Sequence, residues 1–140
     1  MFIEGKNLVK KYGKGEATVF ALDHTDFSME KGEIVVILGP SGSGKSTLLN
    51  ILGGLDKVTE GSMLVEGKDL EQMSAKELEL YRRNQLGFVF QSYNLTPDLT
   101  VRENIEMTAE LVNDPVSVDT LLENLGLVKY QKHFPKELSG

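Results

Sequence analysis

The segment Gly-Pro-Ser-Gly-Ser-Gly-Lys-Ser-Thr at residues 39–47 constrains this chain more than any other. It fits the spacing Gly-x-x-x-x-Gly-Lys-Ser/Thr, whose glycines let the backbone wrap closely around an anion because no Cβ blocks the approach. Successive N–H groups then point at phosphate oxygens, and the positive end of the next helix lies behind them. We therefore predict a phosphate-binding loop, the P-loop, formed by Gly39, Pro40, Ser41, Gly42, Ser43, Gly44, Lys45, Ser46 and Thr47.

Two side chains of this loop have the chemistry that a nucleotide with a bound magnesium ion requires. Lys45 is expected to reach the β- and γ-phosphates as a point charge, and the Ser46 hydroxyl is the expected Mg²⁺ ligand. The surroundings agree, because residues 34–38 (Ile-Val-Val-Ile-Leu) have the pattern of a strand buried on both faces. Residues 47–52 then have the pattern of a helix that stops near Gly53. Strand, loop and helix follow in the required order.

Composition excludes several classes of protein. A length of 140 residues suits one ordinary domain, and no apolar run approaches the ~18 residues of a membrane span. No cleavable signal precedes the motif, so we expect a cytoplasmic protein. The absence of cysteine excludes disulfides and thiolate metal sites. A net charge of −6 argues against a nucleic-acid partner, which attracts basic surfaces.

The rest of the chain divides by pattern at residue 91. Residues 2–10 and 18–29 have strand patterns and predict antiparallel strands ahead of the P-loop. A further strand is expected at 63–67, a helix after the capping box Ser74–Glu77, and a buried strand at 86–90 that Gln91 closes.

From residue 92 onward the pattern is helical. A second capping box, Thr100–Glu103, opens a helix that runs to about Leu111, and another helix covers 117–125 before a terminating glycine at 126. We therefore predict an antiparallel β-subdomain with a P-loop core over 1–91, and a helical subdomain over 92–140.

Five motifs in order resemble the ATP-binding subunits of ABC transporters, most closely the lipoprotein-release and macrolide-export branch. They are Lys-Tyr-Gly at 11–13, the P-loop, Gly-Phe-Val-Phe-Gln at 87–91, Leu-Thr-Val-Arg-Glu-Asn-Ile at 99–105, and Leu-Ser-Gly at 138–140, the first three positions of the signature Leu-Ser-Gly-Gly-Gln. The resemblance implies an α/β fold: a RecA-like P-loop NTPase core with an amino-terminal antiparallel β-subdomain and the start of a helical subdomain.

The resemblance also implies roles for single residues. Tyr12 would stack its aromatic ring on adenine. Gln91 would be catalytic together with Lys45, reaching Mg²⁺ or the attacking water and coupling the site to a membrane partner. Ser139 and Gly140 would contact the γ-phosphate bound on an opposing subunit.

At the level of the whole protein, the resemblance implies an ATPase that uses ATP and Mg²⁺. Its partners would be an integral-membrane permease subunit and a second copy in a nucleotide-dependent homodimer. It would lie in the cytoplasm, peripheral on the inner face of the cell membrane.

The sequence departs from the family pattern after Gln91. No apolar strand followed by Asp and Glu occurs there, although hydrolysis needs the Asp to hold Mg²⁺ and this family adds the Glu to activate water. The switch histidine of the family is absent as well. We therefore expect a domain that is incomplete at its carboxyl end and that, as a 140-residue chain, binds ATP without turning it over.

Other nucleotide-binding classes fit less well. A GTPase would need Asn/Thr-Lys-x-Asp to recognise guanine, and this tetrad does not occur. A P-loop nucleotide kinase can have the same loop sequence, but its chain usually begins with the P-loop strand. This class stays open as an alternative. The acidic charge argues against an ABC-type ATPase of DNA repair.

Overall fold

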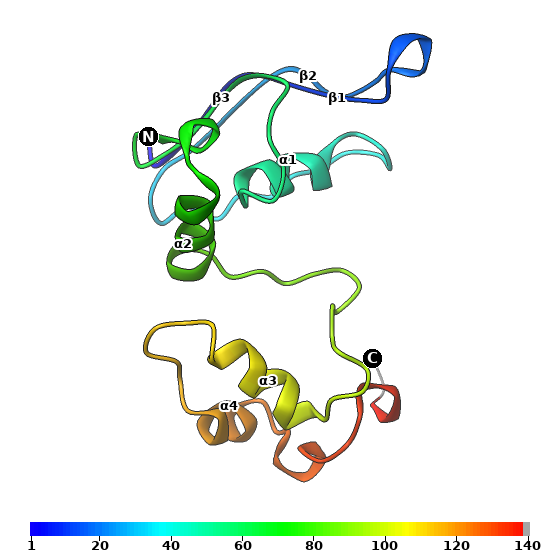
Figure 1. Cartoon of the computed structure of the whole chain (residues 1–140), viewed down its shortest axis with the longest axis vertical. Coiled ribbons are helices and arrows are strands. Elements are labelled where there is room, and N and C mark those ends of the chain that lie inside the picture. Colours follow the sequence, from blue (N-terminus) through cyan, green and yellow to red (C-terminus); the bar gives the residue numbers. More distant parts are fainter. Residues whose placement is uncertain (139–140) are drawn as a thin grey trace. The chain divides into compact units, whose positions relative to one another are not determined.

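The computed structural model describes residues 1–138 and contains an antiparallel sheet and several short helices (Figure 1). One compact unit spans Met1–Arg82, and a second begins at Arg83. The strands of the first unit are β1 (Ile3–Tyr12), β2 (Val19–Met29), β3 (Glu60–Val65) and β4 (Lys68–Asp69). They pair antiparallel in the order β2-β1-β3-β4, which confirms the antiparallel strands predicted ahead of the P-loop.

The helix after the P-loop, α1 (Lys45–Leu52), lies beneath this sheet in the view of Figure 1. Its inward side chains Leu48 and Ile51 are buried together with apolar side chains of the strands. The buried apolar residues of the sheet are Ile3, Leu8, Val9, Leu22, Met63 and Val65. Burial of this apolar surface holds α1 against the sheet, since an eight-residue helix is too short to be stable by itself.

The helices α2 (Ala75–Gln85) and α3 (Val101–Ala109) begin at the two capping boxes predicted from the sequence. In the second box the Thr100 hydroxyl accepts the N–H of Glu103, and the Glu103 carboxylate accepts the N–H of Thr100 at 2.7 Å. Each pair satisfies backbone donors that have no partner within the helix. Helix α4 (Val118–Asn124) follows, and the predicted terminating glycine, Gly126, lies just beyond it with a positive φ of 67°.

Four single turns of 3-10 helix also occur within residues 1–138. They are η1 (Gly15–Ala17), η2 (Leu70–Gln72), η3 (Val128–Tyr130) and η4 (Pro135–Glu137).

Two predicted strands are wrong for this structure. Residues 34–38 form no strand, and Ile34 is 94% exposed where burial on both faces was expected. Residues 86–90 form no strand either, and Val89 is fully exposed, while the rings of Phe88 and Phe90 stack 5.4 Å apart. A strand of this type needs hydrogen-bonded neighbours on both sides, and the described strands pair only with one another.

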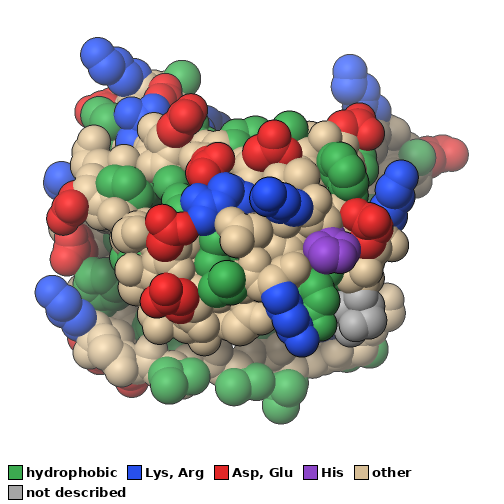
Figure 2. Space-filling view, turned by 90° about the horizontal axis from the view of Figure 1, so that it is seen from below, with side chains coloured by type: hydrophobic (Ala, Val, Ile, Leu, Met, Phe, Trp, Pro, Cys, Tyr) green, Lys and Arg blue, Asp and Glu red, His purple; other side chains and the backbone are tan. Residues whose placement is uncertain are grey.

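Charges of both signs are spread over the face of the molecule shown in Figure 2, with apolar side chains between them. This face therefore does not present the single-sign field that steers a polyanion to a protein. Among residues 1–138, no helix is both long enough and apolar enough to cross a membrane.

Candidate functional site

Residues 42–47 of the P-loop line a cavity at the amino end of α1. The cavity has a volume of about 270 Å³ and is lined by residues 42–47 and by Ala21 of β2. Gly42 and Gly44 both have positive φ, at 80° and 84°, which turns the chain sharply into the helix. The Leu48 N–H then donates to the Gly44 carbonyl at 2.9 Å as the first helical hydrogen bond.

Gly44 is in a place that a side chain could not occupy, because its Cβ would lie 2.1 Å from the backbone carbonyl oxygen of Ala21. A Cβ on Gly39 would lie 2.5 Å from the Ser43 hydroxyl, which can rotate away. The loop is therefore pressed against β2 on one side and folded tightly on itself. The arrangement fits a cradle in which backbone N–H groups face an anion.

The ammonium group of Lys45 lies within this loop. Its Nζ donates to the carbonyl oxygens of Gly39 at 2.9 Å and Pro40 at 2.7 Å, and to the Ser43 hydroxyl at 3.3 Å. All three acceptors are neutral, so phosphate oxygens would make stronger, charge-assisted hydrogen bonds to the same ammonium. The donor set therefore fits a nucleotide polyphosphate. Ser46 and Thr47 lie beside Lys45 in the first turn of α1 and line the same cavity.

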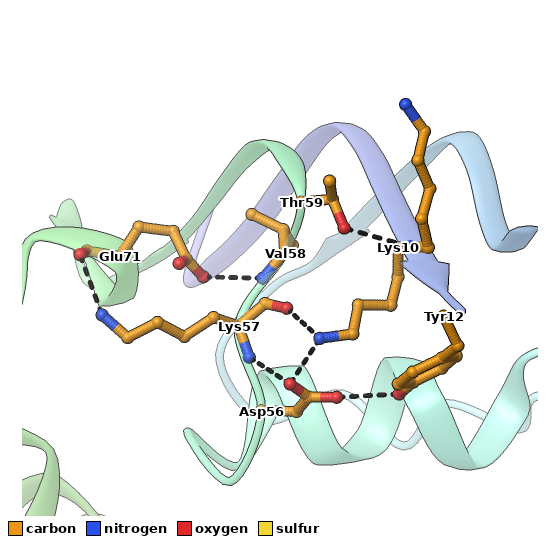
Figure 3. A network of polar contacts seen from close by, with 8 residues as sticks. Lys10, Tyr12, Asp56, Lys57, Val58, Thr59 and Glu71 are labelled. Atoms are coloured by element: carbon orange, nitrogen blue, oxygen red, sulfur yellow. Dashed lines mark hydrogen bonds and ion pairs between the residues drawn. The ribbon is translucent and has the colours of Figure 1, made fainter. Parts of the chain in front are cut away.

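Tyr12 ends β1 and lies opposite Val19 of β2. Its hydroxyl donates to an Asp56 carboxylate oxygen at 2.7 Å, and the Lys10 Nζ lies 5.0 Å from the centroid of its ring (Figure 3). The residue remains 44% exposed. Sequence reasoning identified Tyr12 but not the two residues that hold its side chain.

Asp56 is the centre of this polar network. It accepts hydrogen bonds from the Lys10 ammonium, from Tyr12 and from the Lys57 N–H, the last at 2.7 Å (Figure 3). Burial raises the pKa of Asp56, but these hydrogen bonds outweigh that effect and hold the pKa below its ordinary value of 3.8. The carboxylate is therefore ionised at neutral pH. The alternation of Lys10 and Tyr12 along β1 places both on one face, but no sequence signal identifies Asp56 as their partner.

Gln91 belongs to the second unit and is exposed, at the turn that follows residues 88–90. Tyr93 and Asn94, which follow two and three residues later, both have positive φ, at 60° and 53°. The sequence-predicted Ser139 and Gly140 lie outside the described residues. The structure thus brings the P-loop residues together in the first unit, places Tyr12 in the same unit, and assigns Gln91 to the other.

A buried amide, missed by sequence reasoning, fixes the loop between Gln91 and α3. The Asn104 side chain accepts the Thr96 N–H at 2.8 Å and donates to the carbonyls of Thr96, Leu99 and Thr100 at 3.0–3.1 Å. Both the carbonyl oxygen and the NH2 group of the amide are hydrogen-bonded, as burial requires. The loop is thereby tied to the first turn of α3.

The second unit also contains an apolar cavity of about 460 Å³, lined by α3, α4, the loop between them, the loop before α3 and residues after α4. Apolar side chains form most of its wall, including Leu95, Val101, Ile105, Val112, Leu121 and Leu138.

Comparison with known proteins gives a consistent result. Residues 22–140 match the family described as ABC transporter. A putative ABC transporter ATP-binding protein, the MG065 homolog of Mycoplasma pneumoniae, is 45% identical over 141 residues, covering 99% of this chain and 30% of that protein. The macrolide export ATP-binding/permease protein MacB of Rhodopseudomonas palustris is 43% identical over 143 residues, covering 99% of this chain and 22% of that protein.

Among solved structures, the ATP-binding cassette MJ0796 in a dimeric post-hydrolysis state with ADP and Pi matches with a TM-score of 0.87 and 38% sequence identity. That match covers 98% of this chain and 63% of the cassette. The chain therefore spans less than a third of the two relatives and less than two thirds of the cassette.

These matches confirm the resemblance inferred from the five motifs, including a macrolide-export protein among the relatives. They also confirm the fold class, an α/β P-loop NTPase fold with an amino-terminal antiparallel β-subdomain and the start of a helical subdomain. Because the family match covers most of the chain and a solved cassette shares its fold, this chain belongs to the ABC transporter family.

Proposed function

We propose that this chain is the nucleotide-binding part of an ABC transporter and that it binds ATP with Mg²⁺ in the P-loop cavity. The observation that carries the proposal is the cavity itself, where Lys45 and the backbone of residues 42–47 converge beside Ala21. The named state of the matched cassette, bound to ADP and Pi, supports the same class of ligand.

Each P-loop residue has a defined part in binding. The backbone N–H groups at the start of α1 and the Lys45 ammonium bind phosphate oxygens, and Lys45 exchanges its present carbonyl acceptors for charged ones. The Ser46 hydroxyl is the P-loop ligand for Mg²⁺, which neutralises phosphate charge when it is bound. Gly39, Pro40, Ser41, Gly42, Ser43 and Gly44 shape the cradle, and Thr47 closes it.

Tyr12 stacks on the base, and Gln91 contributes to the metal and water side of the site in the assembled protein. Ser139 and Gly140 act on the γ-phosphate of an opposing subunit. These assignments rest on the matching motif positions and on the exposure of Tyr12 and Gln91. We keep the division into a nucleotide-binding subdomain at 1–91 and a helical subdomain at 92–140.

The full protein, by this proposal, hydrolyses ATP and works with an integral-membrane permease subunit on the inner face of the membrane. Its ATP-binding domains form a nucleotide-dependent homodimer, and nucleic acid is not a partner. The name of the matched MacB protein, an ATP-binding/permease protein, and the dimeric state of the matched cassette support these partners. The 140-residue chain by itself binds nucleotide without meaningful turnover, since residues 92–140 contain no apolar strand ending in Asp-Glu.

The substitution Lys45→Ala tests the proposal. It removes a charge-assisted interaction worth roughly 1.5–3 kcal/mol, so the affinity for a non-hydrolysable ATP analogue should fall about 10- to 150-fold. Isothermal titration measures the affinity, and circular dichroism checks that the fold is retained. Lys31→Ala, in the exposed turn after β2, makes the same change of charge outside the cavity and should leave binding unchanged. Near-wild-type affinity in Lys45→Ala would contradict the proposed site.

A further inference from the structure

The side chain of Tyr12 is held at two points, which leaves one part of its ring available. The Lys10 ammonium lies 5.0 Å from the ring centroid and so lies against one face of the ring. The hydroxyl is bonded to Asp56 at 2.7 Å, which fixes the edge of the ring (Figure 3). Because the residue is still 44% exposed, the ring keeps an accessible surface.

The Lys10 side chain, which lies against the ring, is itself held by two acceptors. The Lys10 side chain is only 12% exposed and forms an ion pair with Asp56, whose side chain is 30% exposed. Lys10 also donates to the Lys57 carbonyl at 2.7 Å, and the Lys57 N–H donates to Asp56. The ammonium is thus largely shielded from water and bonded to two acceptors, which place it beside the Tyr12 ring.

The register of the strands relates this ring to the phosphate cavity. Tyr12 lies opposite Val19 and Lys11 opposite Phe20, while Ala21, the next residue of β2, lines the cavity. The backbone at Tyr12 is therefore about 7 Å along the strand direction from the level of Ala21. Helix α1 begins with the cavity residues and leads at its other end to Asp56. The same helix thus connects the phosphate cradle to the residue that holds the ring.

We propose that Asp56 and Lys10 are positioning residues that hold the Tyr12 ring so that its exposed part stacks on the base of a nucleotide whose phosphates lie in the P-loop. This inference rests on the proposed function. The competing explanation is that the network only fastens β1 to the loop after α1, and this explanation predicts no dependence on the base. Since Asp56 accepts the phenolic hydrogen, a ring without the hydroxyl is also held less firmly.

The test compares two ligands that differ in the base. An ATP analogue carries phosphates and base, whereas inorganic tripolyphosphate carries phosphates alone. Asp56→Ala should lower the affinity for the analogue at least fivefold, within the range of about 5- to 150-fold that base–aromatic stacking spans. The loss should be no larger than the loss caused by Tyr12→Ala. The effect of Asp56→Ala on tripolyphosphate should stay within about twofold, because the phosphate cradle is not altered.

Three further variants make the result specific. The double variant Tyr12→Ala with Asp56→Ala should bind the analogue no more weakly than Tyr12→Ala, since Asp56 acts through the ring. Asp56→Asn keeps a single acceptor oxygen for the three donors that share the carboxylate, so it should restore the affinity only in part. Glu60→Gln removes the negative charge of the neighbouring pair with Lys11, at 2.7 Å, and should leave both affinities unchanged.

The outcomes separate this inference from the function on which it rests. If Asp56→Ala lowers the affinities for the analogue and for tripolyphosphate equally, the network is only structural. If Asp56→Ala leaves the affinity for the analogue unchanged, Asp56 does not position the ring. Either result overturns the inference while wild-type binding leaves the proposed function intact. Failure of the wild-type chain to bind either ligand would overturn both.

Discussion

Replacement of Gly44 by alanine tests how the P-loop is built against the sheet. The residue has φ of +84°, and a Cβ at this position would lie 2.1 Å from the Ala21 carbonyl oxygen and 3.0 Å from a methyl group of Leu22. Real Cβ atoms essentially never approach another heavy atom closer than 3.0 Å, so the loop and β2 must move apart. That movement separates Gly44 from Ala21, the residue of β2 that lines the cavity.

Gly42 supplies a matched control within the same loop. Its φ is +80°, almost the same as that of Gly44, but a Cβ there meets nothing within 4 Å. Left-handed alanine costs roughly 1–2 kcal/mol at either position, and overpacking at Gly44 adds about 1–3 kcal/mol. Alanine also stabilises both variants to a similar extent by restricting the unfolded chain, and this effect cancels in the comparison. Gly44→Ala should therefore be about 1–3 kcal/mol less stable than Gly42→Ala.

Native-state hydrogen exchange is the suitable assay, because the chain has two compact units and the free energy of unfolding must be read in the first unit alone. The free energy of exchange is read at amides of β2 and α1 in both variants. Equal values for Gly44→Ala and Gly42→Ala would refute the argument that the loop is pressed against Ala21. A larger loss in Gly42→Ala would refute it as well.

Two other predictions concern the helical unit and turnover. The Thr100 hydroxyl, and then its backbone N–H, hold the pKa of Glu103 below its ordinary value of 4.5, so the ionised cap stabilises the fold above about pH 4.5 and is lost as pH falls through the lowered value. Thr100→Ala should raise the pKa of Glu103 in an NMR titration and make the stability less sensitive to acid; an unchanged pKa would contradict the cap. The purified 140-residue chain should release phosphate from MgATP no faster than Lys45→Ala, because general-base assistance alone is typically worth 10²–10⁴-fold. Turnover that depends on Lys45 would contradict this expectation.

Features that depend on neighbouring residues could be predicted from the sequence. The P-loop is one, because its glycines, lysine and serine act at fixed spacing within a single turn, and residues 42–47 line one cavity in the structure. The capping boxes at Ser74 and Thr100 are others, since a cap needs only the residue three positions later. The order of such local motifs was also sufficient to indicate the family, which the comparisons confirm.

Features that depend on distant residues were decided only by the tertiary structure. Residues 34–38 have an ideal pattern for a buried strand, yet a strand exists only where another strand supplies hydrogen bonds, and the described sheet supplies none to them. Tyr12 meets Asp56 across 44 positions of the chain, and Asn104 meets a loop that the sequence shows only as irregular. Spacing along the chain specifies which groups a turn brings together, whereas contacts between elements follow from how the whole fold buries its apolar surface.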